Sequence, residues 1–394
     1  MSQFKQISDK NAKVLYLETS ALGQSLLTTP KLNKGSAFSE LERQQFHLRG
    51  KLPYNIEDLS QQVLRCYQQF LKKDNNLEKH LYLRSLHDTN ETLFYKLVSQ
   101  HLTEMLPVLY TPTVGKAVEQ FSQEFQRPRG LYIAYPDRDH IEEIIENRFN
   151  SEVDIIVMTD GAGVLGIGDQ GIGGMDICIV KSMVYVLCGG VNPSRLLPIQ
   201  IDVGTDNEQL LNDPMYLGWR HPRISGKEYD DMVERVVLAI QRKLPQAYLH
   251  WEDFGRENAR RNLERYHQQM CTFNDDMQGT GAVTLVALLS AITRTKVPLT
   301  EQRIVIVGAG TAGTGIADQL CAAMRREGLS QQEALSRFYL VGRHGLLHQA
   351  MPELTAFQKP YARSDLAETG TNLSLHEVVK RFKPSVLIGC SGQG

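Results

Sequence analysis

The sequence predicts an α/β protein with a helical N-terminal region, a central parallel α/β domain and an incomplete Rossmann-type domain. Three observations lead to this prediction. The first third of the chain carries apolar residues at helical spacing, and short β-rich runs then alternate with amphipathic stretches. Such alternation is typical of a parallel sheet with crossover helices. A glycine-rich turn then follows the strand RIVIVG, and we expect domains at 1–128, 129–279 and 280–394.

The individual elements follow from the spacing of apolar residues. Helices are expected at Leu59 to Leu71, Leu77 to Leu86 and Thr92 to Leu106. From about Gly130 the β-rich runs are LYIAY, VDIIVMTD, LLPIQIDVG and AYLHW, and a long apolar helix follows from about Gly279 to Thr293. The third region shows the strands RIVIVG, RFYLVG and PSVLIG, with the helical pattern LSLHEVVKRF before the last of them.

The third region shows fewer strands than its type requires. A doubly wound nucleotide domain has about six strands, whereas about three can be read before the sequence stops at CSGQG. Because a sheet edge would be left uncovered there, we expect a C-terminal truncation. We also expect the 394-residue chain by itself to be inactive or poorly folded.

The composition is that of an ordinary globular protein. Of the 394 residues, 42% are apolar and 22% are charged, with 43 basic side chains against 45 acidic ones. The formal net charge of −2 gives no electrostatic reason to expect nucleic acid or an anionic membrane as a partner. The length is sufficient for two or three domains.

Cysteine usage and the first residues favour the cytoplasm. The six cysteines are scattered without C-x-x-C spacing, which argues against a zinc site and a disulfide framework. The chain begins without the basic head and apolar core of a secretory signal. No apolar run is expected to approach the roughly 20 residues that span a bilayer. We therefore expect a cytoplasmic protein with no membrane segment.

The glycine turn indicates a dinucleotide site. Gly308, Gly310 and Gly313 form a G-x-G-x-x-G pattern between a strand and a helix, where bare glycines let a pyrophosphate approach a helix N-terminus. Glycines used only for tight strand–helix packing remain the alternative. At the end of the next strand, Gly342 and Arg343 stand where an acidic residue normally binds the ribose. The choice between NAD and NADP therefore stays open.

Two acidic doublets are candidates for a metal site. Glu252 and Asp253 follow the strand run AYLHW, and Asp275 and Asp276 precede a helix. Neighbouring strand residues point to opposite faces, so both members can serve one site only where the chain leaves regular structure. Carboxylates at strand ends suit Mg²⁺ or Mn²⁺. Helix N-capping by Asp253 and Asp276 is an equally weighted alternative.

A lysine and a tyrosine are weaker candidates. Lys181 stands on a mostly apolar helix, where it either reaches solvent with its amine or lies desolvated and acts as a base. Tyr110, in LPVLYTPTVG, is more often a core or turn tyrosine than an acid. The histidines show no H-x-x-x-H spacing and are given no metal role.

Taken together, several segments resemble the malic enzyme family. They are LNKGSAFSELER, NETLFYKLV, YTPTVG, PRGLYIAYP, LGIGDQGIGGMD, DVGTDNEQLLNDPMYLGWRHPR, WEDF, FNDDMQGT and GAGTAGTGIAD. They run from about Leu32 to the end of the chain in the family's order and spacing. The resemblance implies conversion of L-malate to pyruvate and CO2 with reduction of NAD or NADP. It also implies Mn²⁺ or Mg²⁺ and a homodimer or homotetramer.

The resemblance also assigns roles to the acidic residues. The family's metal ligands match Glu252, Asp253 and Asp276, and its neighbouring active-site aspartate matches Asp275. A metal chelated by the 2-hydroxyl and adjacent carboxylate of malate would lower the hydroxyl pKa. After oxidation, the same ion would stabilise the enolate formed by loss of CO2.

The proton-transfer and cofactor residues are assigned in the same way. The family's general base matches Lys181, which would take the hydroxyl proton while hydride passes to the nicotinamide. Its general acid matches Tyr110, which would protonate C3 of enolpyruvate. The cofactor turn matches Gly308, Gly310 and Gly313.

The sequence departs from the family pattern at two internal positions. Most malic enzymes place a substrate-binding arginine where this chain has Gly163, and glycine cannot replace that bidentate anchor. The segment then looks like that of malolactic enzymes, which convert malate to lactate with bound NAD and Mn²⁺, so this activity is the alternative. Gly342 replaces a usual aspartate, and Arg343 could attract a 2′-phosphate.

Two further classes compete with the malic enzyme interpretation. Two-domain amino-acid dehydrogenases also pair a lysine with a nucleotide domain but need no metal. The second class is an inactive relative that binds dinucleotide as a sensor or scaffold. The presence of Gly163 in place of the substrate-binding arginine would fit such a protein. The complete acidic set and Lys181 speak against that reading.

Overall fold

The computed structural model describes residues 4–8, 14–125, 127–366 and 372–391. The chain divides into two compact units, Met1–Ala247 and Tyr248–Gly394. The three domains expected from the sequence stay a prediction.

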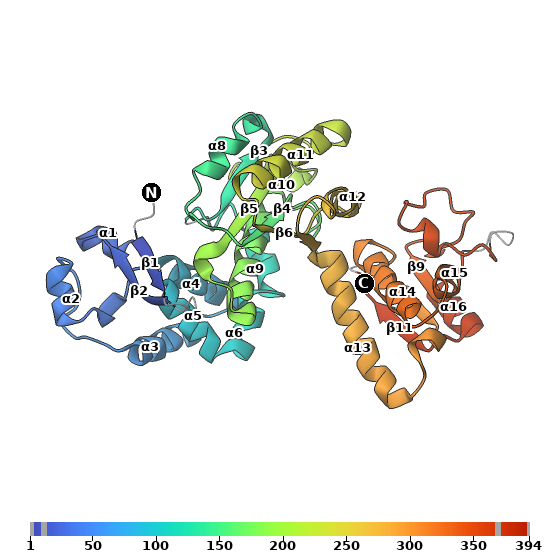
Figure 1. Ribbon diagram of the computed structural model, residues 1–394, viewed down its shortest axis with the longest axis horizontal. Helices are drawn as coiled ribbons and strands as arrows, with labels where there is room; N and C mark the ends of the chain where they lie inside the picture. Colours follow the sequence, from blue (N-terminus) through green and yellow to red (C-terminus); the bar gives the residue numbers. More distant parts are fainter. Residues whose placement is uncertain (1–3, 9–13, 126, 367–371, 392–394) are drawn as a thin grey trace. The chain divides into compact units, whose positions relative to one another are not determined.

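The first unit begins with a β-hairpin that the sequence did not predict. β1 (Phe4–Ser8) pairs antiparallel with β2 (Val14–Thr19) (Figure 1). The helical N-terminal region expected from the sequence therefore begins after this hairpin. Alternating residues such as those of VLYLET favour a strand, but their run is only six residues long.

The helices expected after the hairpin are present, with one interruption. α3 spans Leu59–Leu71, as predicted. The helix expected from Thr92 to Leu106 is two helices, because His101 leaves the helical region with φ −123° and ψ 32°. The helices of this region are α1 (Gly23–Leu27), α2 (Glu40–Gln45), α3, α4 (Asn76–Thr89), α5 (Glu91–Gln100), α6 (Leu102–Leu109) and α7 (Thr113–Glu119).

Three parallel strands form the sheet of the first unit. β5 (Leu196–Asp202) pairs parallel with β3 (Leu131–Ala134) and with β4 (Ile155–Thr159). Each was expected as a β-rich run. The remaining helices of the unit are α8 (Ile141–Glu146), α9 (Gly174–Gly189), α10 (Glu208–Asn212) and α11 (Gly226–Lys243). This part confirms the parallel α/β architecture.

The α9 segment corrects the expectation that no apolar run approaches the length of a membrane span. Residues Gly171–Gly189 have that length and a mean hydropathy of 1.6. However, 72% of this stretch is buried inside the structure, and a core helix has the same length and composition. The apolar residues of α9 pack in the main hydrophobic core of the unit, with Met175, Cys178 and Val180 among them.

The second unit opens with a short pair of strands and a π-helical turn. β6 (Tyr248–Trp251) pairs parallel with β7 (Thr272–Asn274), and α12 (Arg256–Tyr266) connects them. The π-helical turn η5 (Asp275–Gly279) then leads into α13 (Thr280–Thr295). The apolar helix expected from about Gly279 is thus confirmed, with an irregular start.

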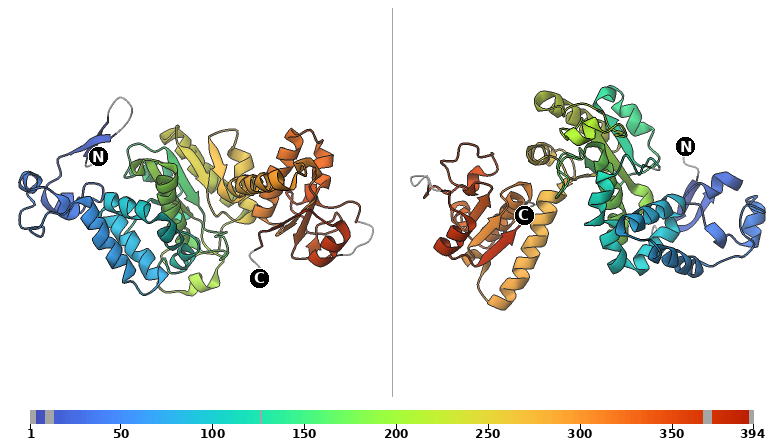
Figure 2. Two further views of the ribbon diagram at one scale, coloured as in Figure 1. Left: turned by 90° about the horizontal axis from the view of Figure 1, so that it is seen from below. Right: turned by 180° about the vertical axis from the view of Figure 1, so that it is seen from behind.

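A four-stranded sheet completes the second unit (Figure 2). The strand order is β10-β9-β8-β11, with β8 parallel to both neighbours and β10 antiparallel to β9. The elements are β8 (Ile304–Val307), α14 (Thr311–Arg326), α15 (Gln331–Ser336), β9 (Phe338–Gly342), β10 (Gly345–Leu346), α16 (Leu375–Phe382) and β11 (Val386–Gly389). The strand–glycine turn–helix unit predicted for RIVIVGAGTAGTGIADQL is therefore present.

Both faces of this sheet are covered at β8, which explains why this strand reads as a continuous apolar run. Ile304 and Ile306 of β8 belong to one buried cluster with α14 residues such as Leu320. Val305 belongs to a separate cluster with Val378 of α16. Successive strand side chains point to opposite faces, so a strand buried on both sides needs apolar residues at every position.

Candidate functional site

The first acidic doublet stands where β6 ends. Glu252 and Asp253 follow Trp251, the last residue of the strand, and both side chains are buried. Asp253 has a φ of 53°, a left-handed conformation that few non-glycine residues adopt. The strand's alternation stops at this residue. The chain therefore leaves regular structure at this doublet, as it must if both carboxylates are to serve one site.

The second doublet lies in the π-helical turn η5. Asn274 caps this turn, because its side chain accepts a hydrogen bond from the backbone N–H of Met277 at 3.0 Å. Asp276 instead accepts a hydrogen bond at Oδ2 from the backbone N–H of Asp253, at 3.0 Å. Asn274 therefore does the capping that the alternative reading gave to Asp276, and the two doublets meet.

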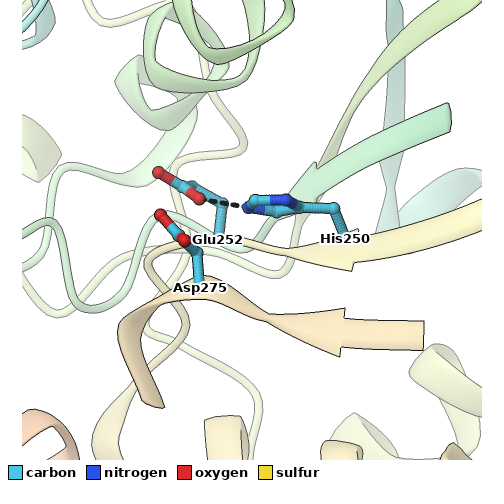
Figure 3. Close-up of side chains that lie close together, drawn as sticks. All are labelled: His250, Glu252 and Asp275. Atoms are coloured by element: carbon cyan, nitrogen blue, oxygen red, sulfur yellow. Dashed lines mark hydrogen bonds and ion pairs between the residues drawn. The ribbon is translucent and has the colours of Figure 1, made fainter. Parts of the chain in front are cut away.

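A histidine joins this cluster (Figure 3). His250 Nε2, a carboxylate oxygen of Glu252 and one of Asp275 lie within 4.8 Å of one another. The imidazole is 1% exposed and is hydrogen-bonded through Nε2 to Oε2 of Glu252. Sequence reasoning missed this residue because it looked for helical spacing. The signal was the alternation H-x-E at the end of a strand, which puts both side chains on one face.

The donor set of the cluster fits a hard divalent cation. Four carboxylates lie on two neighbouring segments, and those of Glu252, Asp253 and Asp276 are 2%, 3% and 5% exposed. Buried carboxylates are stable as ions only when paired, hydrogen-bonded or bound to a metal. Oxygen-rich sets of this kind suit Mg²⁺ or Mn²⁺.

The glycine turn has the backbone geometry that its sequence requires. Gly308 has a φ of 107°, and a Cβ there would lie 2.9 Å from backbone atoms of Cys390 and Ser391. A Cβ at Gly313 would lie only 1.8 Å from the carbonyl oxygen of Gly308. Gly310 is the N-cap residue of α14, and no side chain caps that end of the helix. Tight packing and an open helix N-terminus therefore occur together.

The strand that follows the turn ends as expected. Gly342 is the last residue of β9, and the exposed Arg343 comes directly after it. No acidic side chain occupies either position.

Lys181 and Tyr110 lie beside each other in the first unit. The amine Nζ of Lys181 is 4.9 Å from the centre of the Tyr110 ring, a distance at which a cation interacts with an aromatic face. Lys181 is 9% exposed, so it does not extend into solvent as lysines on apolar helices usually do. Tyr110 ends α6 and packs against the main core.

A partly buried ion pair joins two loops of the first unit. Arg223 donates two hydrogen bonds to Asp169, from Nε at 2.7 Å and from Nη2 at 2.6 Å. Burial would raise the pKa of Asp169, but the Arg223 guanidinium and the backbone N–H of Asp206 hold that pKa below its ordinary value. Burial does raise the pKa of Asp160, which accepts a hydrogen bond from the Tyr229 hydroxyl. Sequence reasoning missed this network, since its members are far apart in the chain.

The strand–glycine turn–helix unit and the carboxylate cluster define an α/β protein with a dinucleotide-type turn and a candidate cation site. Residues 87–267 match the family description "Malic enzyme, N-terminal domain". Residues 277–394 match "Malic enzyme, NAD binding domain". The chain belongs to the malic enzyme family.

Two NAD-dependent malic enzymes agree with this assignment. An NAD-dependent malic enzyme of Aeromonas hydrophila is 50% identical over 375 residues, covering 94% of this chain and 66% of its own length. One from Aliivibrio fischeri is 49% identical over 389 residues, covering 98% of this chain and 69% of its own length. The chain thus spans about two thirds of the length of these relatives. A crystal structure of Entamoeba histolytica malic enzyme is 21% identical, covers 88% of this chain and 61% of its own, and gives a TM-score of 0.46.

Proposed function

We propose that the protein catalyses the metal-dependent oxidative decarboxylation of L-malate to pyruvate and CO2, with reduction of NAD. The observation that carries this proposal is that the two acidic doublets meet: carboxylate oxygens of Glu252 and Asp275 lie within 4.8 Å of each other, and Asp276 accepts a hydrogen bond from the backbone N–H of Asp253. The relatives that are named NAD-dependent malic enzymes support it, because their sequences are 50% and 49% identical to this chain.

The acidic cluster would hold the divalent cation. Glu252, Asp253 and Asp276 are its proposed ligands, and Asp275 is the proposed neighbouring active-site carboxylate. A Mn²⁺ or Mg²⁺ ion bound there supplies Lewis-acid polarisation of the substrate's oxygen atoms. The protein's part is to hold the carboxylates in place, through the turn at Asp253 and the hydrogen bond from its N–H to Asp276.

Lys181 and Tyr110 would carry the proton transfers. Lys181 Nζ is the proposed base for the 2-hydroxyl proton of malate, and Tyr110 is the proposed acid that protonates C3 of enolpyruvate. Their support is the low exposure of Lys181 and its contact with the Tyr110 ring.

The glycine turn would bind the pyrophosphate of NAD at the N-terminus of α14. Backbone N–H groups and the helix dipole favour a phosphate at such a position. The names of the relatives favour NAD over NADP. Arg343 supports the NADP alternative, since a guanidinium can pair with a 2′-phosphate.

We infer a cytoplasmic homodimer or homotetramer, with malate and pyruvate as the small-molecule partners. The cytoplasmic location is supported by six cysteines that are all free thiols. The oligomer is supported by the family resemblance alone.

One assay tests the activity and its alternatives. The purified protein is supplied with L-malate, Mn²⁺ and either NAD or NADP, and the products are identified. Pyruvate with reduced NAD, lost on EDTA treatment and restored by Mn²⁺, supports the proposal. Activity that resists EDTA favours an amino-acid dehydrogenase type of enzyme. Lactate without net reduction of NAD would favour malolactic activity, the second candidate that Gly163 suggests. Dinucleotide binding without turnover would favour the inactive relative.

A further inference from the structure

His250 stands next to the proposed metal ligands but is not one of the family's acidic residues. It lies on β6, two residues before Glu252, and both side chains are almost completely buried. Figure 3 shows the imidazole and the Glu252 carboxylate pointing toward each other, with the Asp275 carboxylate beside them.

The imidazole is held in place from the neighbouring strand. The ring of Phe273, on β7, meets it edge to face, with ring centres 5.6 Å apart and an angle of 65° between the planes. β6 and β7 pair directly, and His250 and Phe273 are partners in their register. A buried aromatic contact of this kind limits the orientations of the ring.

The hydrogen bond from this ring restricts the Glu252 carboxylate. A carboxylate has two oxygens and rotates about its last torsion, so by itself it can offer a cation several geometries. With His250 Nε2 on Oε2, one oxygen is engaged and the other is set in direction. Groups that hydrogen-bond to metal ligands commonly fix them in this way.

We propose that His250 is a positioning residue of the metal centre, which orients Glu252 for the cation without binding the cation itself. This inference rests on the proposed function, in which the acidic cluster binds a divalent ion. An imidazole suits the task because its ring N–H can donate a hydrogen bond to the carboxylate oxygen that it faces.

The test measures Mn²⁺ binding directly, in the absence of malate and dinucleotide. His250→Phe keeps a flat ring of similar size but removes the hydrogen bond, and we expect its Mn²⁺ dissociation constant to rise about 10- to 100-fold. His250→Gln keeps a donor, and we expect most of the affinity to return. Titration calorimetry and the electron paramagnetic resonance signal of free Mn²⁺ both report this constant.

A matched control separates this role from a general effect on folding. His267→Phe makes the same change at a histidine that caps the end of α12 and contacts only backbone carbonyls in its hydrogen bonds. It should leave Mn²⁺ binding unchanged, and NADH binding should be unchanged in all of the variants. If His250→Phe does not fold, His250→Asn takes its place, because its amide is too short to reach Glu252.

The possible outcomes are distinct. Wild-type Mn²⁺ affinity in a folded His250→Phe variant overturns the inference but leaves the proposed function intact. Coupling of Mn²⁺ to a histidine ¹⁴N nucleus in pulsed resonance spectra of the wild type also overturns it, since His250 would then be a ligand. If the wild type binds no Mn²⁺ at all, the proposed function fails, and the role of His250 fails with it.

Discussion

At the scale of single residues, the backbone conformation of Asp253 allows its side chain and that of Glu252 to contribute to the same site. In a continuing strand its side chain and that of Glu252 would point to opposite faces. Its φ of 53° ends the alternation, at a cost of about 1–3 kcal/mol for a non-glycine residue. Such strain persists where the surrounding structure holds it. Here the hydrogen bond from its N–H to Asp276 does so.

The metal assignment makes a direct prediction at Asp276. Asp276→Asn keeps the size of the side chain and removes its charge, so we expect the Mn²⁺ dissociation constant to rise at least about tenfold. Asp74→Asn, an exposed acid in the first unit, is the control and should change nothing. Unchanged metal affinity in Asp276→Asn, measured by titration, would show that the ligand assignment is wrong.

The ion pair of Arg223 and Asp169 predicts a loss of stability. Arg223→Ala would leave a partly buried carboxylate without its bidentate partner, and we expect the free energy of unfolding to fall by about 1–3 kcal/mol. The pKa of Asp169 is lowered in the folded state. Its contribution is therefore present above the unfolded pKa and is lost as the pH falls through the folded pKa. Urea unfolding at neutral and acidic pH measures both effects, and the difference between wild type and variant should shrink in acid.

The site residues that the sequence revealed belong to local patterns, whereas those that it did not reveal depend on contacts formed in the fold. Acidic doublets and glycine turns are local patterns, so Glu252, Asp276 and Gly308 stood out in the sequence. His250 did not, because its partner Glu252 is recognised only once the segment is known to be a strand. Arg223 and Asp169 are 54 positions apart, and no local pattern joins them.

At the scale of elements, periodicity predicted the strands of both units and the bounds of α3, because their apolar spacing is regular. It failed at short or irregular elements. The hairpin of β1 and β2 has strands of five and six residues, and β7 has three. The π-helical turn η5 was also unforeseen, since its spacing differs from that of the α-helix that follows it.

The packing of α14 against η5 predicts that a glycine of α14 influences the metal site. A Cβ at Gly315 would lie 2.8 Å from both Cα and the carbonyl oxygen of Met277, which follows Asp276. Gly315→Ala should push the turn away and weaken Mn²⁺ binding, and overpacking of this kind costs about 1–3 kcal/mol of stability. Calorimetric titration with Mn²⁺ and a thermal melt measure the two effects.

A second glycine on the facing helix provides the control. Gly281→Ala adds the same methyl group on α13, where the nearest atoms, Gln319 Cβ and the Gly315 carbonyl oxygen, are 3.0 Å away. It does not press on Met277, so Mn²⁺ affinity should stay within about threefold of wild type. Equal losses of affinity in both variants would mean that helix packing in general, rather than the contact with η5, sets the site.

At the scale of the whole molecule, stability should decrease below neutral pH because two histidines are buried. Burial lowers the pKa of His80 and of His87. Below the unfolded pKa of about 6.5, the unfolded chain takes up protons that the folded chain does not, so stability falls as the pH falls. Each group contributes up to about 1.4 kcal/mol per pH unit in this range.

His87→Phe tests this dependence. The imidazole already packs against Phe94 and Tyr95, so an aromatic ring fits its surroundings. Between pH 7 and about 5.5, the variant should lose less unfolding free energy than the wild type. His140→Phe, at a side chain that is 68% exposed, is the control and should keep the wild-type slope. Parallel slopes for wild type and His87→Phe would contradict the prediction.

The overall architecture was predictable to the extent that it is encoded in local patterns. The fold class, the parallel sheets and the glycine turn followed from periodicity and from glycine spacing. The meeting of the two acidic doublets followed only from the resemblance, because 22 residues separate Asp253 from Asp276 and the pairing of β6 with β7 brings them together.

The π-helical turn Asp275–Gly279 depends on how many residues the segment contains as well as on which residues they are. Point substitutions do not change the number of residues in this segment. They can therefore replace the residues around the turn while its additional residue, relative to an α-helix, remains. Only an insertion or a deletion would convert it into ordinary helix, in a single step and with the loss of the carboxylate spacing. Among related proteins, the number of residues in this segment should therefore stay the same for longer than the residues themselves.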